Sequence, residues 1–219
     1  MNRFLAARLA EARVMPIVSV GGEAEAIALV DDLVEAGAAA IEILFRHPRA
    51  ADVLHHCRTR HRHILLAAGT IMDTELGRRA AEAGADFMIS PGLTPSLAAF
   101  AATTSLPLIP GAQTPSEVML AAEHGFQVLK FYPAEPNDAA AILKDYANVF
   151  PSIYFIPTGG IGEPSLAKYG ALPNVLAVGG SWTHGRRLPG SERPAEVANA
   201  LRRARSLLGA GPDIVAPAP

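Results

Sequence analysis

The sequence has little that would suit a secreted, membrane-spanning or nucleic-acid-binding protein. Its single cysteine, Cys57, cannot form an internal disulfide, so we expect a reducing, cytoplasmic setting. No uncharged run reaches the roughly 18 apolar residues that a membrane span needs. The segment Met1–Arg13 lacks the unbroken apolar stretch of a signal peptide. The formal net charge of −2 offers no electrostatic attraction for nucleic acid or an anionic membrane, so neither is an expected partner.

Sequence signatures of cofactors are also missing. There is neither a Rossmann glycine fingerprint nor a Walker motif, so we expect no nucleotide cofactor. The histidines His55, His56, His61 and His63 have spacings that resemble those of metal ligands. They fall late in a helical pattern and before a strand, however, far from the expected site. We therefore interpret them as surface residues and predict no metal and no cofactor.

What is present is a regular alternation of short apolar runs and longer helical patterns. Half of the residues are hydrophobic and 18% are charged, which is typical of a well-buried globular protein. The runs are apolar almost throughout, as in parallel strands that are covered on both faces. Asp73, Thr94 and Thr114 precede three helical patterns with side chains suited to capping. The eight runs are Met15–Val20, Ala40–Phe45, Ile64–Gly69, Phe87–Ser90, Leu106–Pro110, Val128–Tyr132, Ile153–Pro157 and Val175–Val178.

Eight strand–helix units predict an α/β fold, a single (β/α)8 TIM barrel over residues 14–208. An extra N-terminal helix, residues 1–13, is expected to pack on the barrel. Residues 209–219 are rich in proline, glycine and alanine and are expected to form a flexible tail. The alternative is an open doubly wound sheet. We favour a closed barrel because there are eight runs and a helical pattern follows each of them.

Lys130 is the strongest candidate for a catalytic residue. The active site of a barrel lies at the carboxyl ends of its strands, and Lys130 stands near the end of Val128–Tyr132 among large apolar side chains. Lysine is rarely buried without a reason, and burial favours its neutral amine, which can attack a ketone to form a Schiff base. Two other roles remain open: an ion pair with a carboxylate, or phosphate binding by the same amine.

Glu42 is the second charge inside an apolar run. A buried carboxylate is costly unless it has a partner, which Lys130 can supply. Glu42 can then move protons as a general acid and base, or the two residues can form a purely structural ion pair. Arg46 follows at the strand end, where its planar guanidinium can clamp a carboxylate or a phosphate. Arg49 is expected at the solvated start of the next helix.

Two glycine-rich segments follow the seventh and eighth runs. Thr158–Gly159–Gly160 and Gly179–Gly180–Ser181 stand where barrels commonly bind phosphate through backbone amides. Glycine lets the backbone approach an anion closely, and the Ser181 hydroxyl can donate as well. Tight turning alone is the alternative, but the presence of both segments in the expected places favours a phosphate site.

Seven phrases at seven strand ends resemble the bacterial 2-dehydro-3-deoxy-phosphogluconate (KDPG) aldolases, which are class I enzymes of the Entner–Doudoroff route. The resemblance runs in order over residues 14–182 and is carried by separate short motifs. The phrases are Ile41-Glu42-Ile43-Leu44-Phe45-Arg46, Ala68-Gly69-Thr70, Ile89-Ser90-Pro91-Gly92-Leu93-Thr94, Pro107-Leu108-Ile109-Pro110-Gly111, Leu129-Lys130-Phe131-Tyr132-Pro133-Ala134-Glu135, Pro157-Thr158-Gly159-Gly160-Ile161 and Gly179-Gly180-Ser181-Trp182.

The resemblance implies a role for each site residue. Lys130 would form the carbinolamine and iminium with the substrate's C2 carbonyl, and Glu42 would move protons, partly through water. Arg46 and Thr70 would hold the pyruvate carboxylate, and Tyr132 would pack beside the iminium. The remaining implied substrate contacts, for that carboxylate end and for the hydroxyls and phosphate, are Pro91, Thr158, Gly159, Gly160, Gly179, Gly180 and Ser181. The family needs no metal and is usually a homotrimer.

The implied activity is cleavage of 2-dehydro-3-deoxy-6-phosphogluconate to pyruvate and glyceraldehyde 3-phosphate. The enzymatic alternatives are cleavage of 4-hydroxy-2-oxoglutarate or of the C4-epimeric sugar acid by the same lysine. A barrel that binds a phosphosugar without turnover is the non-enzymatic alternative. Ile43 stands where the family commonly has threonine, Tyr132 where it commonly has phenylalanine, and His47 where it usually has a small polar residue. These three departures can alter the pocket around the substrate hydroxyls.

Overall fold

Parallel strands alternate with helices along the chain. The computed structural model describes residues 3–184, 192–212 and 214. The strands are β1 Val14–Ser19, β2 Ala40–Leu44, β3 Leu65–Gly69, β4 Phe87–Ile89, β5 Leu108–Ile109, β6 Val128–Phe131, β7 Tyr154–Pro157 and β8 Val178–Gly180. The helices are α1 Arg3–Ala12, α2 Glu23–Glu35, α3 Ala50–Arg60, α4 Thr74–Glu82, α5 Pro95–Thr103, α6 Pro115–Glu123, α7 Ala139–Val149, α8 Leu166–Gly170 and α9 Arg193–Leu208, with short 3-10 helices η1 Glu135–Asn137, η2 Glu163–Ser165 and η3 Trp182–His184. Within these residues, every helix is too short or too polar to cross a bilayer.

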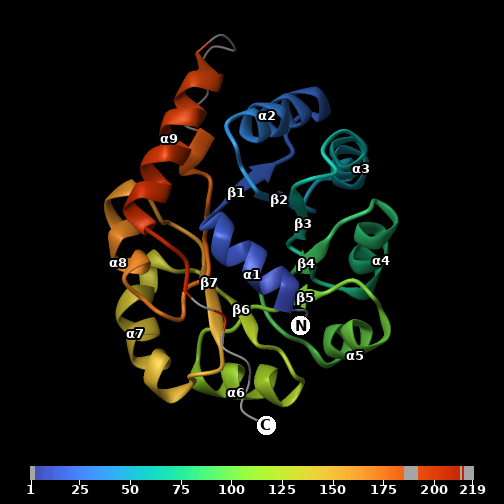
Figure 1. Cartoon of the computed structure of the whole chain (residues 1–219). Coiled ribbons are helices and arrows are strands. Elements are labelled where there is room, and N and C mark those ends of the chain that lie inside the picture. The colour runs from blue at the N-terminus through green and yellow to red at the C-terminus, as the bar shows by residue number, and fades with distance from the viewer. Residues whose placement is uncertain (1–2, 185–191, 213, 215–219) are drawn as a thin grey trace.

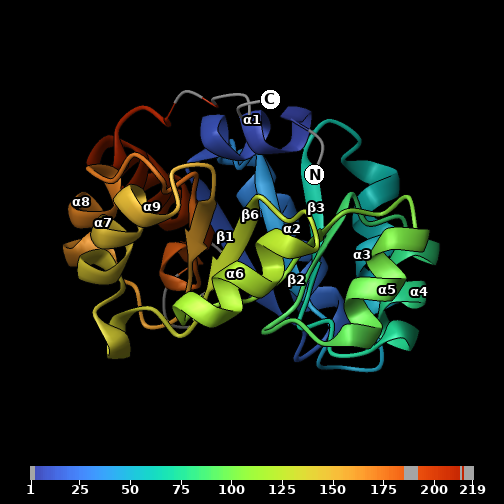
Figure 2. The same cartoon turned by 90° about the horizontal axis from the view of Figure 1, so that it is seen from below.

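The strands form a curled parallel arrangement with helices around it (Figure 1). Six strands make one sheet in the order β5-β4-β3-β2-β1-β8, and β6 pairs with β7. Isolated parallel bridges Gly111↔Lys130 and Thr158↔Gly179 connect β6 and β7 to their neighbours on either side. Helix α1 lies across one end of the strands (Figure 2). The alternation predicted from the sequence is thus confirmed as an α/β fold.

Both faces of the strands are buried, which explains why the runs are apolar almost throughout. One cluster of buried side chains, which includes Ile41, Ile43 and Leu129, lies between the strands and the outer helices. A second cluster joins α1 residues such as Leu9 to strand residues such as Val128, inside the curl. Successive strand residues point to opposite faces, so position along a strand decides which cluster a side chain enters.

The eighth strand lies further along the chain than the predicted Val175–Val178. Val175 makes only an isolated bridge with Phe155, whereas Pro16 of β1 pairs with Gly180. Gly179 and Gly180 therefore belong to the strand itself, not to the turn after it. Glycine has a low strand propensity, so its sequence pattern predicted a turn, and pairing with β1 overrides that local preference.

The N-terminal helix ends at Ala12, one residue earlier than predicted, and Met1 and Asn2 lie outside the described residues. Arg13 was expected on this helix but is buried, with a left-handed φ of 57°. Its guanidinium donates to the carbonyl oxygens of Val175, Leu176, Leu208 and Gly209. The left-handed backbone at Arg13 ends the helix, and the long side chain pairs these four acceptors.

The described part of the predicted flexible tail, residues 209–212 and 214, lies against α1. Gly211 passes so close to the backbone of Ala10 that a side chain there would overlap it. Ile214 packs against the interior cluster that α1 covers. Asp213 and residues 215–219 lie outside the described residues.

Candidate active site

Lys130 and Glu42 meet inside the curled sheet. In β6, Leu129 and Phe131 pack toward the outer helices, so the side chain of Lys130 between them points inward. The same alternation in β2 turns Glu42 inward. The Lys130 Nζ lies 3.0 Å from Glu42 Oε1, with the lysine side chain 9% exposed and the glutamate fully buried. The two charges that the sequence places in apolar runs therefore form one buried ion pair.

Glu42 is held by a close approach of the backbone at Gly69. A Cβ at position 69 would overlap the carboxylate and would lie 2.7 Å from Glu42 Cγ. Because Glu42 faces β3 at this point, only glycine leaves room for it. The second carboxylate oxygen, Oε2, is buried and has no hydrogen-bond partner in the described part of the chain. Such an oxygen can accept a proton or bind water without breaking the contact with Lys130.

Two further residues of the predicted site surround Lys130. The ring centroid of Tyr132 lies 5.7 Å from Lys130 Nζ, within the range of a cation–π contact, and the tyrosine is 41% exposed. Gly111 pairs with Lys130 as an isolated bridge and approaches the backbone of Pro91 closely. Gly111 therefore lies between Pro91 and Lys130, on the side of β6 that faces away from β7.

Arg46 and Thr70 come together at the ends of the paired strands β2 and β3. Arg46 is exposed, and its Nε donates to Thr70 Oγ1 at 3.1 Å. Thr70 has a φ of 61°, a left-handed conformation that non-glycine residues rarely adopt and that often marks functional sites. The remaining guanidinium nitrogens of Arg46 make no ion pair with a described carboxylate, so they can bind an anion.

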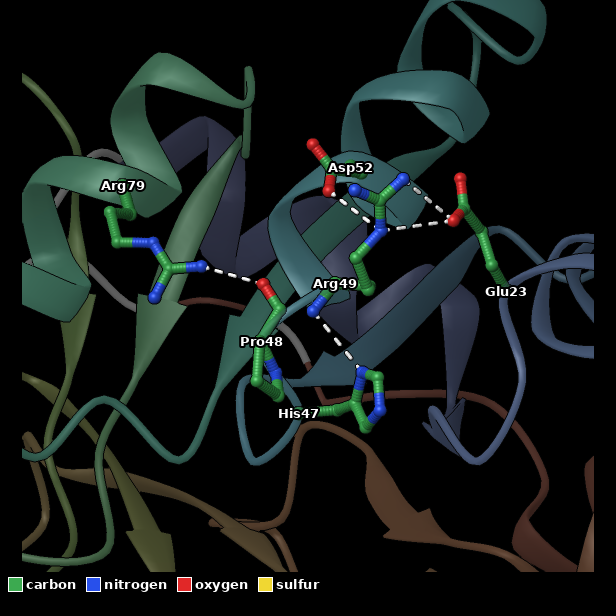
Figure 3. A network of polar contacts seen from close by, with 6 residues as sticks. All are labelled: Glu23, His47, Pro48, Arg49, Asp52 and Arg79. Carbon is green, nitrogen blue, oxygen red and sulfur yellow. Dashed lines mark hydrogen bonds and ion pairs between the residues drawn. The ribbon is translucent and has the colours of Figure 1, made fainter.

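A polar network braces the segment that follows β2 (Figure 3). Arg49 is exposed and directly precedes α3, as predicted for the solvated start of that helix. Its side chain donates at 2.9 Å to Glu23, the first residue of α2. The backbone N–H of Arg49 donates to His47 Nδ1 at 3.1 Å, which places the proton of a neutral His47 ring on Nε2. Arg79 of α4 donates to the carbonyl oxygen of Pro48. These contacts hold the backbone of residues 47–49, directly after Arg46, in place.

The two glycine-rich segments are neighbours. Thr158 and Gly179 form a parallel bridge, and the Thr158 hydroxyl fills the space beside the glycine. Gly159 and Gly160 have φ values of 102° and 76°, which L side chains rarely adopt. The amides of Gly159, Gly160 and Ile161 donate to no acceptor among the described residues. This turn therefore presents three successive free N–H groups, the usual means of binding an anion.

The end of β8 completes this corner. Gly180 lies directly under the indole of Trp182, where any side chain would overlap the ring. Ser181 is exposed at the strand end, so its hydroxyl is accessible beside the turn after β7. The corner thus combines free amides and a hydroxyl donor.

One contact in this region could not be predicted from the sequence. The hydroxyl of Tyr169 in α8 donates to Glu135 Oε1 at 2.8 Å, at the start of η1 after β6. The only hint of this contact in the sequence is that Glu135 belongs to one of the motifs that resemble the KDPG aldolases. Tyr169 lies in a short helix with no distinguishing pattern.

Comparison with known proteins identifies the family. The family model described as KDPG and KHG aldolase matches residues 5–200. The chain is 38% identical over 172 residues to the 2-dehydro-3-deoxy-phosphogluconate aldolase of Pseudomonas aeruginosa, and the match covers 78% of each chain.

Two solved structures share the fold. The 2-keto-3-deoxy-6-phosphogluconate aldolase of Zymomonas mobilis ZM4, solved with 3-phosphoglycerate, has a TM-score of 0.87 and 31% identity, and the match covers 98% of this chain and 99% of that one. The KDPG aldolase of Legionella pneumophila, with pyruvate captured at low pH as a covalent carbinolamine, has a TM-score of 0.84 and 31% identity, and the match covers 90% and 95%. This chain therefore belongs to the KDPG and KHG aldolase family, whose members are lyases.

Proposed function

We propose that this protein cleaves 2-dehydro-3-deoxy-6-phosphogluconate to pyruvate and glyceraldehyde 3-phosphate through a Schiff base on Lys130. The observation that carries the proposal is the buried lysine 3.0 Å from a buried carboxylate, at the matching motif of an aldolase family. An amine inside an apolar strand has little reason to be there unless it reacts or binds. Glu42 beside it supplies a proton acceptor within hydrogen-bond reach.

The first half of the reaction forms the covalent intermediate. Lys130 transfers a proton to Glu42, and its free amine attacks the C2 carbonyl of the substrate to give a carbinolamine. Glu42 returns a proton to the departing hydroxyl, which leaves as water, and an iminium remains. The carbinolamine captured in the Legionella pneumophila relative supports this step.

The second half breaks the C3–C4 bond. Loss of the C4 hydroxyl proton to Glu42, directly or through water, releases glyceraldehyde 3-phosphate, and the bonding electrons flow into the iminium to form a neutral enamine. Protonation of the enamine at C3 and hydrolysis of the resulting iminium release pyruvate and regenerate Lys130. The unpartnered Oε2 of Glu42 gives one carboxylate the capacity to serve both halves.

The remaining site residues anchor the two ends of the substrate. We assign the pyruvate carboxylate to Arg46 and Thr70, with Pro91 shaping that end, and pack Tyr132 beside the iminium. The hydroxyls and phosphate are assigned to the corner of Thr158, Gly159, Gly160, Gly179, Gly180 and Ser181. Three free amides, together with the 3-phosphoglycerate present in the Zymomonas mobilis relative, support the phosphate assignment.

A pyruvate-release assay on purified protein tests the proposal. We expect release from the phosphorylated substrate, and borohydride with pyruvate should add one reduced adduct to the protein mass. Both signals should disappear in Lys130→Ala and persist in Lys144→Ala, a matched control at an exposed lysine of α7. Turnover or an adduct in Lys130→Ala would contradict the assignment. Phosphosugar binding by the wild type with neither turnover nor an adduct would favour a non-catalytic barrel.

The name of the matching family also includes KHG, so 4-hydroxy-2-oxoglutarate is a second candidate substrate. The same Lys130 chemistry applies to it, but it has no phosphate to occupy the turn after β7. Comparison of kcat/KM for the two substrates and for the C4 epimer decides between them. A faster reaction of the unphosphorylated acid would contradict the phosphate assignment.

We further propose an eight-stranded closed barrel over residues 14–208 and a cytoplasmic homotrimer. The two isolated bridges on either side of the β6–β7 pair support closure. The exposed Met72 and Leu120 offer apolar surface for association between copies. Sedimentation equilibrium tests the trimer, and a single monomeric species at micromolar concentration would contradict it.

A further inference from the structure

The loops after β6 and β7 are joined along their backbones. The pairing of the two strands continues past their ends, because the N–H of Ala134 donates to the Thr158 carbonyl at 2.9 Å and that of Glu135 donates to the Gly159 carbonyl at 3.0 Å. The loop after β6 thus pairs with the carbonyl groups of Thr158 and Gly159, the first residues of the turn after β7. The N–H side of Gly159 and Gly160 is left free.

The side chain of Glu135 also packs against this turn. A Cβ added at Gly160 would lie 3.1 Å from Glu135 Cβ and 3.6 Å from its Cγ, so the glutamate stem lies directly beside the glycine backbone. A displaced Glu135 would therefore alter the packing around Gly160. Glu135 is an exposed residue, so packing alone constrains its side chain only weakly.

Tyr169 supplies that missing constraint. The tyrosine is buried in α8, and its hydroxyl donates to Glu135 Oε1 at 2.8 Å. Burial, and then the contact with Glu135, raise the pKa of Tyr169, so the hydroxyl keeps its proton and remains a donor. The bond holds the carboxylate against α8, in a fixed position relative to the amides of the turn.

We propose that Tyr169 and Glu135 are positioning residues that hold the turn Gly159–Gly160 in its anion-binding conformation. The proposal rests on the proposed function, because it assumes that this turn receives the substrate phosphate. Neither residue needs to touch the substrate. Loss of their hydrogen bond should weaken recognition of phosphate while the chemistry at Lys130 continues.

The test compares kcat/KM for the phosphorylated substrate with kcat/KM for 4-hydroxy-2-oxoglutarate. This ratio does not depend on the fraction of folded enzyme, so partial loss of stability does not obscure the result. In Tyr169→Phe and Glu135→Ala the ratio should fall about three- to tenfold, as expected for the loss of one hydrogen bond. The inhibition constant of inorganic phosphate should rise by a similar factor.

Two variants serve as controls. Glu135→Gln keeps an oxygen that accepts from Tyr169, so its ratio should return to within about twofold of the wild type. Tyr146→Phe removes a similar buried hydroxyl, which donates to the Gln113 carbonyl after β5 at 3.1 Å, and should leave the ratio unchanged. A Tyr146→Phe effect as large as that of Tyr169→Phe would mean that any lost hydroxyl disturbs the site, and would overturn the proposal.

The remaining outcomes separate this proposal from the proposed function. An unchanged ratio and an unchanged phosphate inhibition constant in Tyr169→Phe, with the wild type preferring the phosphorylated substrate, overturn only the positioning role. A loss in Glu135→Gln equal to that in Glu135→Ala also overturns it, because the hydrogen bond would not be the cause. If the wild type cleaves neither substrate or does not prefer the phosphorylated one, the proposed function fails first and the positioning role falls with it.

Discussion

The buried ion pair of Lys130 and Glu42 can be tested for stability separately from catalysis. The perturbation is a double-mutant cycle of Lys130→Met, Glu42→Met and the double variant. Methionine is unbranched and flexible, so it fills the space of either side chain without a charge. All three variants should lack activity, but they should differ in their free energy of unfolding.

The magnitude follows from the burial of the two groups. With Glu42 fully buried and Lys130 9% exposed, removal of either partner leaves a charge with almost no access to solvent. Breaking such a pair costs about 3–5 kcal/mol, whereas replacing both partners by apolar side chains is often close to neutral. For a chain of this size, about 1 kcal/mol shifts Tm by roughly 2–4 °C, so each single variant should lose about 6–20 °C.

Thermal melting followed by circular dichroism measures the three variants, with Lys144→Met as a control at an exposed lysine. We expect the double variant to melt well above either single variant. Losses of the single variants that add up in the double variant would refute a coupled ion pair, because independent sites add and coupled sites do not. A loss below about 1 kcal/mol in each single variant would also contradict a buried pair.

Three further predictions follow from the packing. Gly69→Ala should lower kcat by about tenfold or more, because its Cβ displaces Glu42 and general acid–base catalysis contributes about 10²-fold or more. Gly162→Ala is the control: its added Cβ would come no closer than 3.7 Å to a neighbouring atom, so kcat should stay near the wild-type value. Arg13→Met should reduce the free energy of unfolding in urea by on the order of 3 kcal/mol, because hydrogen bonds from a charged donor to buried carbonyls are lost. Arg8→Met, which loses one exposed hydrogen bond and a cation–π contact with Phe4, is the control, and an equal change in the two variants would contradict this. Burial raises the pKa of Cys57 to about 12, so at pH 8 its thiol stays protonated and should react with Ellman's reagent only after unfolding; rapid labelling of the native protein would disprove it.

Much of the local structure could be predicted because local patterns encode it. Apolar runs and helical periodicity located the eight strands, and Asp73, Thr94 and Thr114 cap their helices as predicted, each accepting from a backbone N–H three residues later. The charges of Lys130 and Glu42 stood out because each interrupts an apolar run. Because the strands are apolar on both faces, alternation alone did not show which face is interior, and the inward direction of both side chains came from the structure.

The tertiary structure alone decided which of these residues meet. The 3.0 Å contact between Lys130 and Glu42, 88 positions apart, depends on how the sheet curls, and no local pattern encodes that. The extension of β8 into its glycines came from pairing with β1, and the contact of Tyr169 with Glu135 came from the packing of α8 against the loop after β6. Periodicity and propensity act over a few neighbouring residues and so determine the elements. Register and packing act between distant segments, and they determine the site.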